Sequence, residues 1–305
     1  MQKQSSSPSN ADSPTASGIL YAILAYGTWG LLPIYWKLFG TTPAVEVLCH
    51  RIIWSACLLI IVLLLQKRWP EFSQLWKSPR ILGILFTTAS LLALNWGTFI
   101  YGVNVNRVVE TSLGYFINPL LSILLGAIFL KEQLNFWQIV AVALATLGVS
   151  VFIRDFGSIP WIALGLALTF GSYGLIRKVT PVVPLVGLAV ETVLVTPIAL
   201  ILVGYWTTLG QSNFGASVPL TLLFISCGLI TSLPMLWFNN AAKGLPLSTL
   251  GFLQYLLPTL QLLLGVFLYH EPFTKTHIIA FGCIWSGLVI YSTNLLWLRR
   301  SKQST

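Results

Sequence analysis

Long apolar runs separated by short polar connections dominate the chain. A membrane-spanning helix needs about 20 mostly apolar residues, and ten segments meet this requirement. They are residues 18–39, 44–66, 79–103, 108–130, 134–153, 158–177, 182–204, 218–241, 246–269 and 276–298. Because these runs are continuous and lack the alternation of barrel strands, we predict an all-α membrane protein with ten transmembrane helices.

One apolar stretch occurs twice. The sequence PLLSILLGAIFLKE at 119–132 aligns without a gap with PTLQLLLGVFLYHE at 258–271. The register continues into the next apolar segment, through the matched pairs Ile139/Ile278, Ala141/Ala280 and Gly148/Gly287. Since an internal repeat sets the architecture, we predict two five-helix repeats with short tails. The repeats cover 18–153 and 158–298, and the tails cover 1–17 (disordered) and 299–305 (basic).

An odd number of helices in each repeat requires the two copies to lie in opposite orientations. Residues 26–31 resemble 170–175, and Thr42-Pro43 resembles Thr180-Pro181, which extends the repeat to its first two helices. Inverted repeats recur in transporters that open alternately to the two sides of a membrane. A duplicated bundle with no transport role is the alternative interpretation.

The composition indicates that this chain lies in a lipid environment. Apolar residues make up 56% and charged residues 8%, whereas soluble domains carry about 25% charged residues. The net charge of +9 comes from short Lys and Arg clusters between spans, typical of orientation signals rather than of a nucleic-acid surface. The four Cys form no CxxC pair, so we expect neither a metal site nor a disulfide, and no cofactor.

The same Lys and Arg clusters predict the orientation. With the N-terminus in the cytoplasm, twelve fall in inside segments and four in outside segments, namely Lys37, Arg107, Arg154 and Lys275. Because cytoplasmic segments carry the excess of positive charge, we predict that both termini are cytoplasmic. The first apolar run is too long for a signal-peptide core, so we expect a retained helix.

Ionisable residues within spans are functional candidates because a charge in lipid costs several kcal/mol. Glu191 lies near the middle of the seventh span and Arg51 in the second, at nearly equivalent positions of the two repeats. We predict that both line a substrate pathway, with proton coupling at Glu191 or through His50. The alternatives are a snorkelling Arg51, a protonated or packing Glu191, and a structural His50. Whether Arg51 and Glu191 pair directly stays open.

Further polar and aromatic side chains lie within the spans. The candidates for the substrate pathway beside Arg51 and Glu191 are Trp29, Asn95, Trp96, Tyr115, Asn118, Gln254 and Tyr255. Trp96 and Tyr115 suit an aromatic wall with cation–π contacts. The alternative for the amides is interhelical bonding, worth about 0.6 kcal/mol each. Glu46, Glu110, Glu132 and Glu271 lie at span ends, and we expect caps and loop contacts there.

Several chemical signatures are absent from the sequence. No Walker A loop, HExxH helix or paired acidic motif occurs, so neither an NTP-driven pump nor a membrane enzyme is predicted. A non-transporting scaffold or sensor remains the competing function.

Two motifs are the most specific in the chain, SLGYFINPL at 112–120 and LSTLGFLQY at 247–255. Through them the chain resembles the RarD family of EamA-type drug/metabolite transporters, and the resemblance runs from Tyr26 to about Tyr291. It implies ten helices in two inverted repeats and an inner-membrane permease for small metabolites or drugs, commonly proton- or exchange-coupled. The nine pathway candidates match family-patterned positions, and no catalytic residues are implied. His270 departs from the pattern, since Gly is more usual there.

Together these inferences predict a secondary transporter that exports small organic solutes by alternating access. Two five-helix halves would rock around a mid-membrane cavity near Arg51, Asn95, Tyr115 and Glu191.

Overall fold

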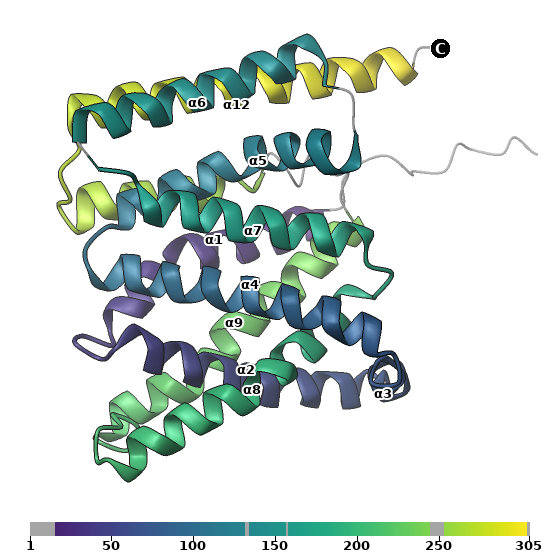
Figure 1. The fold of residues 1–305 in the computed structure, drawn as a ribbon, viewed down its shortest axis with the longest axis vertical. Coiled ribbons are helices and arrows are strands. Elements are labelled where there is room, and N and C mark those ends of the chain that lie inside the picture. The colour runs from purple at the N-terminus through teal and green to yellow at the C-terminus, as the bar shows by residue number, and fades with distance from the viewer. Residues whose placement is uncertain (1–15, 132–133, 157, 245–252, 304–305) are drawn as a thin grey trace, which may run out of the picture.

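A computed structural model describes residues 16–131, 134–156, 158–244 and 253–303, and over these residues it shows helices and no strand (Figure 1). The helices are α1 (Ala16–Lys37), α2 (Ala44–Leu65), α3 (Trp69–Leu75), α4 (Pro79–Asn104), α5 (Val108–Leu130), α6 (Phe136–Phe156), α7 (Trp161–Val179), α8 (Pro184–Thr208), α9 (Val218–Gly244), α11 (Leu256–Leu263) and α12 (Lys275–Gln303). A π-helical turn, Leu264–Leu268, continues α11.

Eight of the described helices are long and apolar enough to cross a membrane: α1, α2, α4, α5, α6, α8, α9 and α12. The predicted sixth and ninth spans fall short. The apolar part of α7, Trp161–Arg177, covers about 25 Å at 1.5 Å per residue, against about 30 Å of hydrocarbon. The described apolar part of the ninth span is Leu256–Leu268, and residues 246–252 of that prediction lie outside the described residues.

The helix α3 was not predicted from the sequence, which indicated only a connection there. Pro70 stands in its first turn, and Glu71 forms a 2.8 Å ion pair with Arg68. Pro and an acidic residue in a first turn favour helix initiation, and they were the missed signal. The Arg68 hydrogen bond holds the pKa of Glu71 below its ordinary value. Only Phe72 of this helix is buried, so α3 is an amphipathic link.

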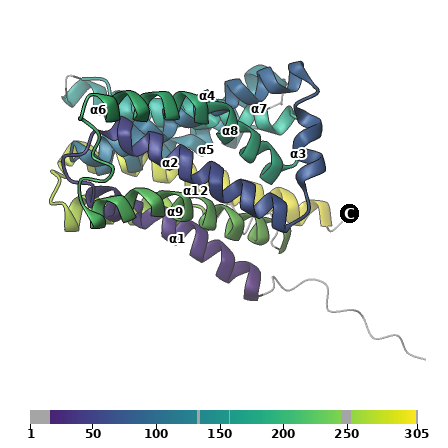
Figure 2. The ribbon, with the colours of Figure 1, turned by 90° about the horizontal axis from the view of Figure 1, so that it is seen from below.

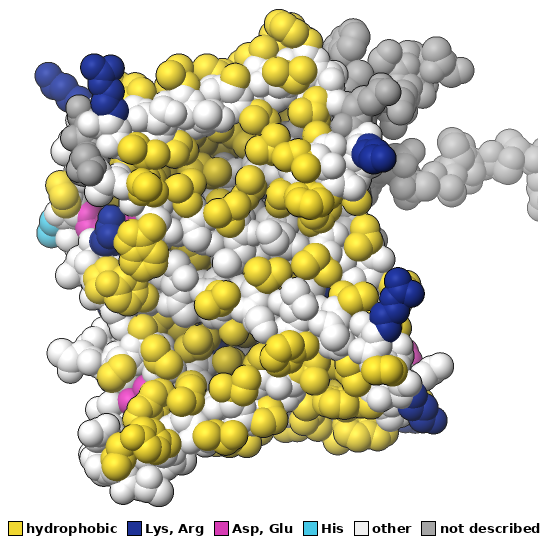
Figure 3. Space-filling view, in the orientation of Figure 1, with side chains coloured by type: hydrophobic (Ala, Val, Ile, Leu, Met, Phe, Trp, Pro, Cys, Tyr) yellow, Lys and Arg dark blue, Asp and Glu magenta, His cyan; other side chains and the backbone are white. Residues whose placement is uncertain are grey.

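The outer surface is strongly apolar. Figure 3 shows hydrophobic side chains spread over the body of the molecule, with Lys and Arg near its left and right edges. Large apolar side chains such as Leu65, Ile201 and Phe267 are 77%, 71% and 71% exposed. Contiguous apolar surface of this extent marks contact with a membrane or a partner, and the long apolar helices favour the membrane.

The described ends of the chain lie at the same end of the bundle. Figures 1 and 2 show the first turn of α1 and the last turn of α12 on the side that also holds α3. Both ends lie on one side of a membrane if the chain crosses it an even number of times.

The helices α6 and α12 pack against each other through reciprocal contacts. A Cβ placed on Gly148 would lie 2.8 Å from the carbonyl oxygen of Ala280, and one on Gly287 would lie 2.8 Å from that of Ala141. These four residues are the pairs that the sequence repeat matches. Such reciprocity is what a two-fold axis between equivalent segments produces. Ala141 of α6 meets Gly287 of α12, and Gly148, further along α6, meets Ala280, which comes earlier in α12. The two helices therefore run antiparallel.

Other pairs of repeat-related helices also meet. Helix α2 packs on α8, and α5 packs on α11, where the Ser112 hydroxyl donates to the Pro258 carbonyl oxygen at 2.8 Å. The repeat-matched residues Leu260 and Leu121 lie against Gly30 of α1 and Gly171 of α7, respectively. The two halves therefore interlock along much of their length rather than forming separate bundles.

The close approach of α6 and α12 predicts that alanine substitutions at two glycines of α12 have different effects on stability. Gly287→Ala should lower the stability by about 1–3 kcal/mol, because its new methyl group meets the Ala141 carbonyl oxygen. Gly282→Ala is the matched control. Nothing lies within 4 Å of its Cβ position, so the variant should be neutral or more stable by up to about 1 kcal/mol. Thermal unfolding of both variants in detergent measures the difference, and equal midpoints would contradict the α6–α12 packing.

Candidate functional site

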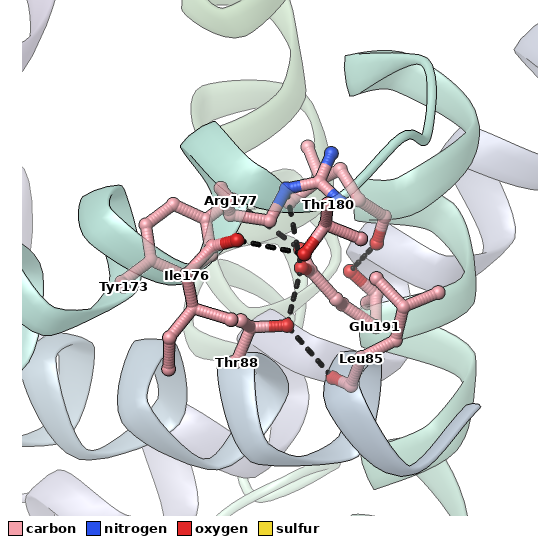
Figure 4. A network of polar contacts seen from close by, with 9 residues as sticks. Leu85, Thr88, Tyr173, Ile176, Arg177, Thr180 and Glu191 are labelled. Carbon is pink, nitrogen blue, oxygen red and sulfur yellow. Dashed lines mark hydrogen bonds and ion pairs between the residues drawn. The ribbon is translucent and has the colours of Figure 1, made fainter. Parts of the chain in front are cut away.

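Glu191 of α8 is the centre of a buried polar network, and its side chain is only 1% exposed. The Thr88 hydroxyl of α4 donates to Oε1 at 2.6 Å, and the Tyr173 hydroxyl of α7 donates to Oε2 at 3.3 Å. Arg177, also on α7, forms an ion pair with Nε 3.6 Å from Oε1. Figure 4 shows these side chains converging on the carboxylate. The network therefore joins α4 of the first half to α7 and α8 of the second.

Local sequence explains this arrangement. Tyr173 and Arg177 are four residues apart, so they lie on one face of α7. The four-residue connection 180–183 then turns the chain so that the start of α8 lies beside the end of α7. Gly187, one turn before Glu191, provides the space for Arg177, since a Cβ there would collide with the guanidinium group.

Arg177 is the member of this network that the sequence analysis did not single out. It was counted only among the cytoplasmic orientation signals, although its side chain is just 12% exposed beside Glu191. The available signal was its spacing from Tyr173 together with the short connection to the next span. Removing one partner of a buried ion pair typically costs about 3–5 kcal/mol, because the other charge is left uncompensated.

Arg51 of α2 lies in a second buried cluster, in which aromatic rings surround its guanidinium group. The guanidinium carbon is 4.1 Å from the ring centroid of Trp96 and 5.1 Å from that of Trp36, and Arg51 is 4% exposed. Tyr35, Tyr115 and Cys227 pack in the same cluster as Trp36. Among the described residues no carboxylate pairs with Arg51, and its Nε and Nη1 have no hydrogen-bond partner.

The aromatic contacts do not offset the cost of burying this charge. A desolvated cation–π contact contributes about 2 kcal/mol, whereas the effective penalty for one buried ion is several kcal/mol. Arginine stays protonated in proteins, so it does not escape the penalty by losing its proton. The Arg51 cluster is therefore a positively charged site with spare hydrogen-bond donors.

Arg51 and Glu191 occupy corresponding places but do not form an ion pair with each other. Each is the eighth residue of its helix, counted from Ala44 and Pro184. Because α2 and α8 run in opposite directions (Figure 1), the two residues lie toward opposite ends of the bundle. Their partners are also different. Arg51 and Glu191 thus belong to two separate clusters instead of meeting in one.

His50 points into an aromatic pocket rather than toward Arg51. Its ring stacks on Phe214 at a centroid distance of 4.7 Å and lies 4.2 Å from the ring of Phe224. Neither ring nitrogen has a hydrogen-bond partner among the described residues. A role of His50 in proton coupling stays a prediction, and this packing provides it no relay partner in the described part of the chain.

The two predicted asparagines differ in their surroundings. Asn95 donates from Nδ2 to the Leu166 carbonyl oxygen and to the Thr169 hydroxyl, both at 3.0 Å, and so connects α4 to α7. This is the interhelical bonding that the sequence left open as an alternative. Asn118 is 5% exposed, and its Oδ1 is buried without a partner in the described structure. It therefore retains an acceptor for another group.

The remaining candidates lie apart from both clusters or at their edge. Tyr115 packs edge-on against Phe99 at 5.8 Å and borders the Arg51 cluster. Trp29 contacts Phe238 at 5.8 Å. Gln254 and Tyr255 are half-buried at the start of α11. Of the predicted set, the structure brings together Arg51, Trp96 and Tyr115.

Carboxylates cap several helix starts, as the sequence analysis expected. Glu271 accepts hydrogen bonds from the backbone nitrogens of Val108 and Val109, at 2.6 and 2.8 Å, at the start of α5. Glu110 accepts one from Ile162 at 3.0 Å at the start of α7. These carboxylates satisfy unpaired backbone N–H groups and complement the helix dipole. Glu132 lies outside the described residues.

Comparison with known proteins identifies the family. The model of the EamA-like transporter family matches residues 16–154 and matches again over residues 158–293. The chain belongs to the EamA-like transporter family. An uncharacterized transporter, YojE of Bacillus subtilis, is 43% identical, and the alignment covers 94% of this chain and 98% of YojE. The protein RarD of Escherichia coli is 41% identical over 94% of this chain and 97% of RarD.

The EamA-like assignment confirms the resemblance to RarD that the sequence motifs indicated. One solved crystal structure, 18% identical, superposes with a TM-score of 0.59 and covers 93% of this chain and 99% of the other, a likeness in fold. Family membership and eight apolar helices of spanning length make this a multi-pass membrane protein of a transporter family. The names of the relatives indicate transporters rather than enzymes.

The buried Arg177–Glu191 pair predicts strong coupling between two substitutions. Arg177→Met should destabilise the EamA-like protein by about 3–5 kcal/mol, because Glu191 then lacks its cation. Adding Glu191→Gln should recover part of this loss, since no uncompensated carboxylate remains. Arg68→Met is the control, because its exposed pair with Glu71 contributes about 0–1 kcal/mol. Unfolding midpoints in detergent give the cycle, and strictly additive losses would show that the pair is not coupled.

Proposed function

We propose that this protein is a secondary transporter that exports small organic solutes from the cytoplasm across the inner membrane by alternating access, with proton coupling at Glu191. The observation that carries the proposal is the reciprocal antiparallel packing of α6 and α12 at repeat-matched residues. It supports two copies of one fold in opposite orientations. Exchanging the conformations of two such copies converts an inward-open protein into an outward-open one.

The proposed architecture has ten crossings. Eight crossings are the long helices, and the other two would be the shorter apolar helices α7 and α11. The π-helical turn extends α11. An even number of crossings agrees with the shared side of the two described chain ends. Short or broken helices are common where transporters bind their substrates, because neighbouring elements satisfy the freed backbone groups.

The proposed orientation follows from charge at the two ends of the bundle. Lys67, Arg68 and Lys77 flank α3, at the end that holds both chain ends. The opposite end carries fewer basic residues, among them Lys37 and Lys275. The excess of Lys and Arg on the cytoplasmic side supports cytoplasmic termini.

The proposed coupling uses the network around Glu191. When charged, the carboxylate holds Thr88 of α4 and Arg177 of α7 in place. Protonation would remove the attraction to Arg177 within the second half and weaken the charge-assisted hydrogen bond from Thr88, which connects the two halves. A proton bound from one side would thereby bias the protein between two arrangements, as a local change of charge does in other switches.

The competing function is a scaffold or sensor that moves no solute. Such a protein would show no flux in liposomes and would tolerate apolar residues in place of its buried polar groups. The cost of burying Glu191 and Arg51 argues for a use of these charges.

Replacing the coupling carboxylate should abolish proton-coupled flux. We expect Glu191→Gln to fold with lowered stability, because Gln keeps the size of the side chain and its acceptor oxygen for Thr88, while Arg177 loses its carboxylate. Solutes that stabilise the purified protein against heat are loaded into proteoliposomes that contain a pH-sensitive dye. The wild type and a Glu71→Gln control, altered at an exposed ion pair, should move protons with the solute. Proton movement by Glu191→Gln equal to the wild type would remove Glu191 from the mechanism.

Reporter fusions should place the ends and the loops of the bundle. Green fluorescent protein fused after residue 305 should fluoresce, because it folds in the cytoplasm. Alkaline phosphatase inserted at Gly210, in the turn between α8 and α9, should be active, because it requires the outside. The reverse pattern would overturn the proposed orientation and, with it, the direction of the coupling argument.

A further inference from the structure

We infer that Arg51 is an anion-binding centre and that the solutes this protein transports carry a carboxylate group. The inference rests on the proposed transport function and names its substrate class. The guanidinium group of Arg51 carries a charge that no described carboxylate balances within the apolar part of the bundle.

The charges buried in the bundle do not sum to zero around Arg51. Glu191 is already paired with Arg177, so that network is close to neutral. Glu46, Glu110 and Glu271 accept backbone hydrogen bonds at the ends of helices. Glu71, the fifth carboxylate with a described side chain, pairs with Arg68 on the surface. Arg51 therefore lacks a described protein anion, and an anionic ligand would supply the missing charge.

Other buried donors without partners lie close to Arg51. Trp36, whose ring contacts the guanidinium group, has a buried Nε1–H without an acceptor. Ser55 follows Arg51 by one turn of α2, and its buried hydroxyl has no partner in the described structure either. Indole N–H and hydroxyl groups suit the oxygens of a carboxylate, as does the guanidinium group.

Helix α9 adds a further buried hydroxyl group to the surroundings of Arg51. Gly228 lets α9 approach α2 so closely that a Cβ there would collide with the carbonyl group of Trp54. Cys227, its neighbour in sequence, packs in one cluster with Trp36, whose ring contacts Arg51. Thr231 lies one turn further along α9, and its buried hydroxyl is unpaired among the described residues. The region where α9 packs on α1 and α2 is thus lined by hydrogen-bond donors that have no acceptor among the described residues.

The aromatic rings determine how a ligand would approach. Trp96 and Trp36 lie within cation–π distance of the guanidinium group. Rings that cover the faces of a guanidinium group leave its N–H edge for hydrogen bonds, and arginine binds carboxylates through that edge. The same rings provide a surface for a flat apolar body. The site therefore favours a carboxylate attached to a planar or apolar group, and its positive charge disfavours a purely cationic solute.

Three probes of one shape and different charge test the inference directly. Benzoate is anionic at pH 7, benzamide is neutral and benzylamine is cationic. We expect benzoate to raise the unfolding temperature of the purified wild-type protein and to change its tryptophan fluorescence with saturation, because Trp96 and Trp36 border the site. Benzamide and benzylamine should do neither at the same concentrations. Equal or stronger binding of either would overturn the inference, and this arm needs no variant.

Variants locate the binding site. Arg51→Gln should weaken benzoate binding about tenfold or more, as expected for loss of a charge-assisted hydrogen bond. Arg51→Lys should retain part of the affinity, because it keeps the charge but loses the planar donor edge. Arg68→Gln, at the exposed pair outside the spans, should bind as the wild type does. Unchanged binding by Arg51→Gln would overturn the assignment to Arg51.

Flux measurements separate this inference from the proposed function. Charge-selective binding that depends on Arg51, without flux of any carboxylate in proteoliposomes, would support the anion site and refute transport. Flux of neutral or cationic solutes that persists in Arg51→Gln would support transport and refute the inferred substrate class.

Discussion

Lipid offers no hydrogen bonds, so each polar group in this bundle must find its partner within the protein or in a ligand. The carboxylate of Glu271 shows how the protein meets this constraint, since it accepts hydrogen bonds from two of the free N–H groups at the start of α5. Asn95 does the same between α4 and α7. These bonds hold neighbouring helices in register where hydrophobic contact alone specifies little, because lipid tails are as apolar as leucine.

Two buried charges meet the same constraint in different ways. Glu191 is surrounded by donors from three sides, and its network connects the two halves of the chain. Arg51 is surrounded by rings and has donor atoms without acceptors in the described structure. A satisfied charge can stabilise one arrangement and respond to a proton, whereas an unsatisfied charge favours a ligand of opposite sign. Coupling and substrate recognition would then belong to separate places that one rocking motion connects.

Close helix packing would give the proposed motion rigid units. Gly148 and Gly287 allow α6 and α12 to approach through reciprocal contacts with Ala280 and Ala141. Small residues at such crossings increase van der Waals contact, which drives helix association in membranes. The α6–α12 pair can therefore hold the two halves together while helices nearer the polar clusters shift.

The sequence by itself determined the helical class, the repeat and the family, because long apolar runs, matched glycines and the motif SLGYFINPL are properties of local order. It also identified Arg51 and Glu191, since a charge in an apolar run is conspicuous. Only the tertiary structure decided which side chains meet them. Arg177, fourteen positions before Glu191, pairs with it because a short turn folds α8 back along α7. Trp36 meets Arg51 because α1 and α2 both pack on α9, and this arrangement depends on packing between helices rather than on any local pattern.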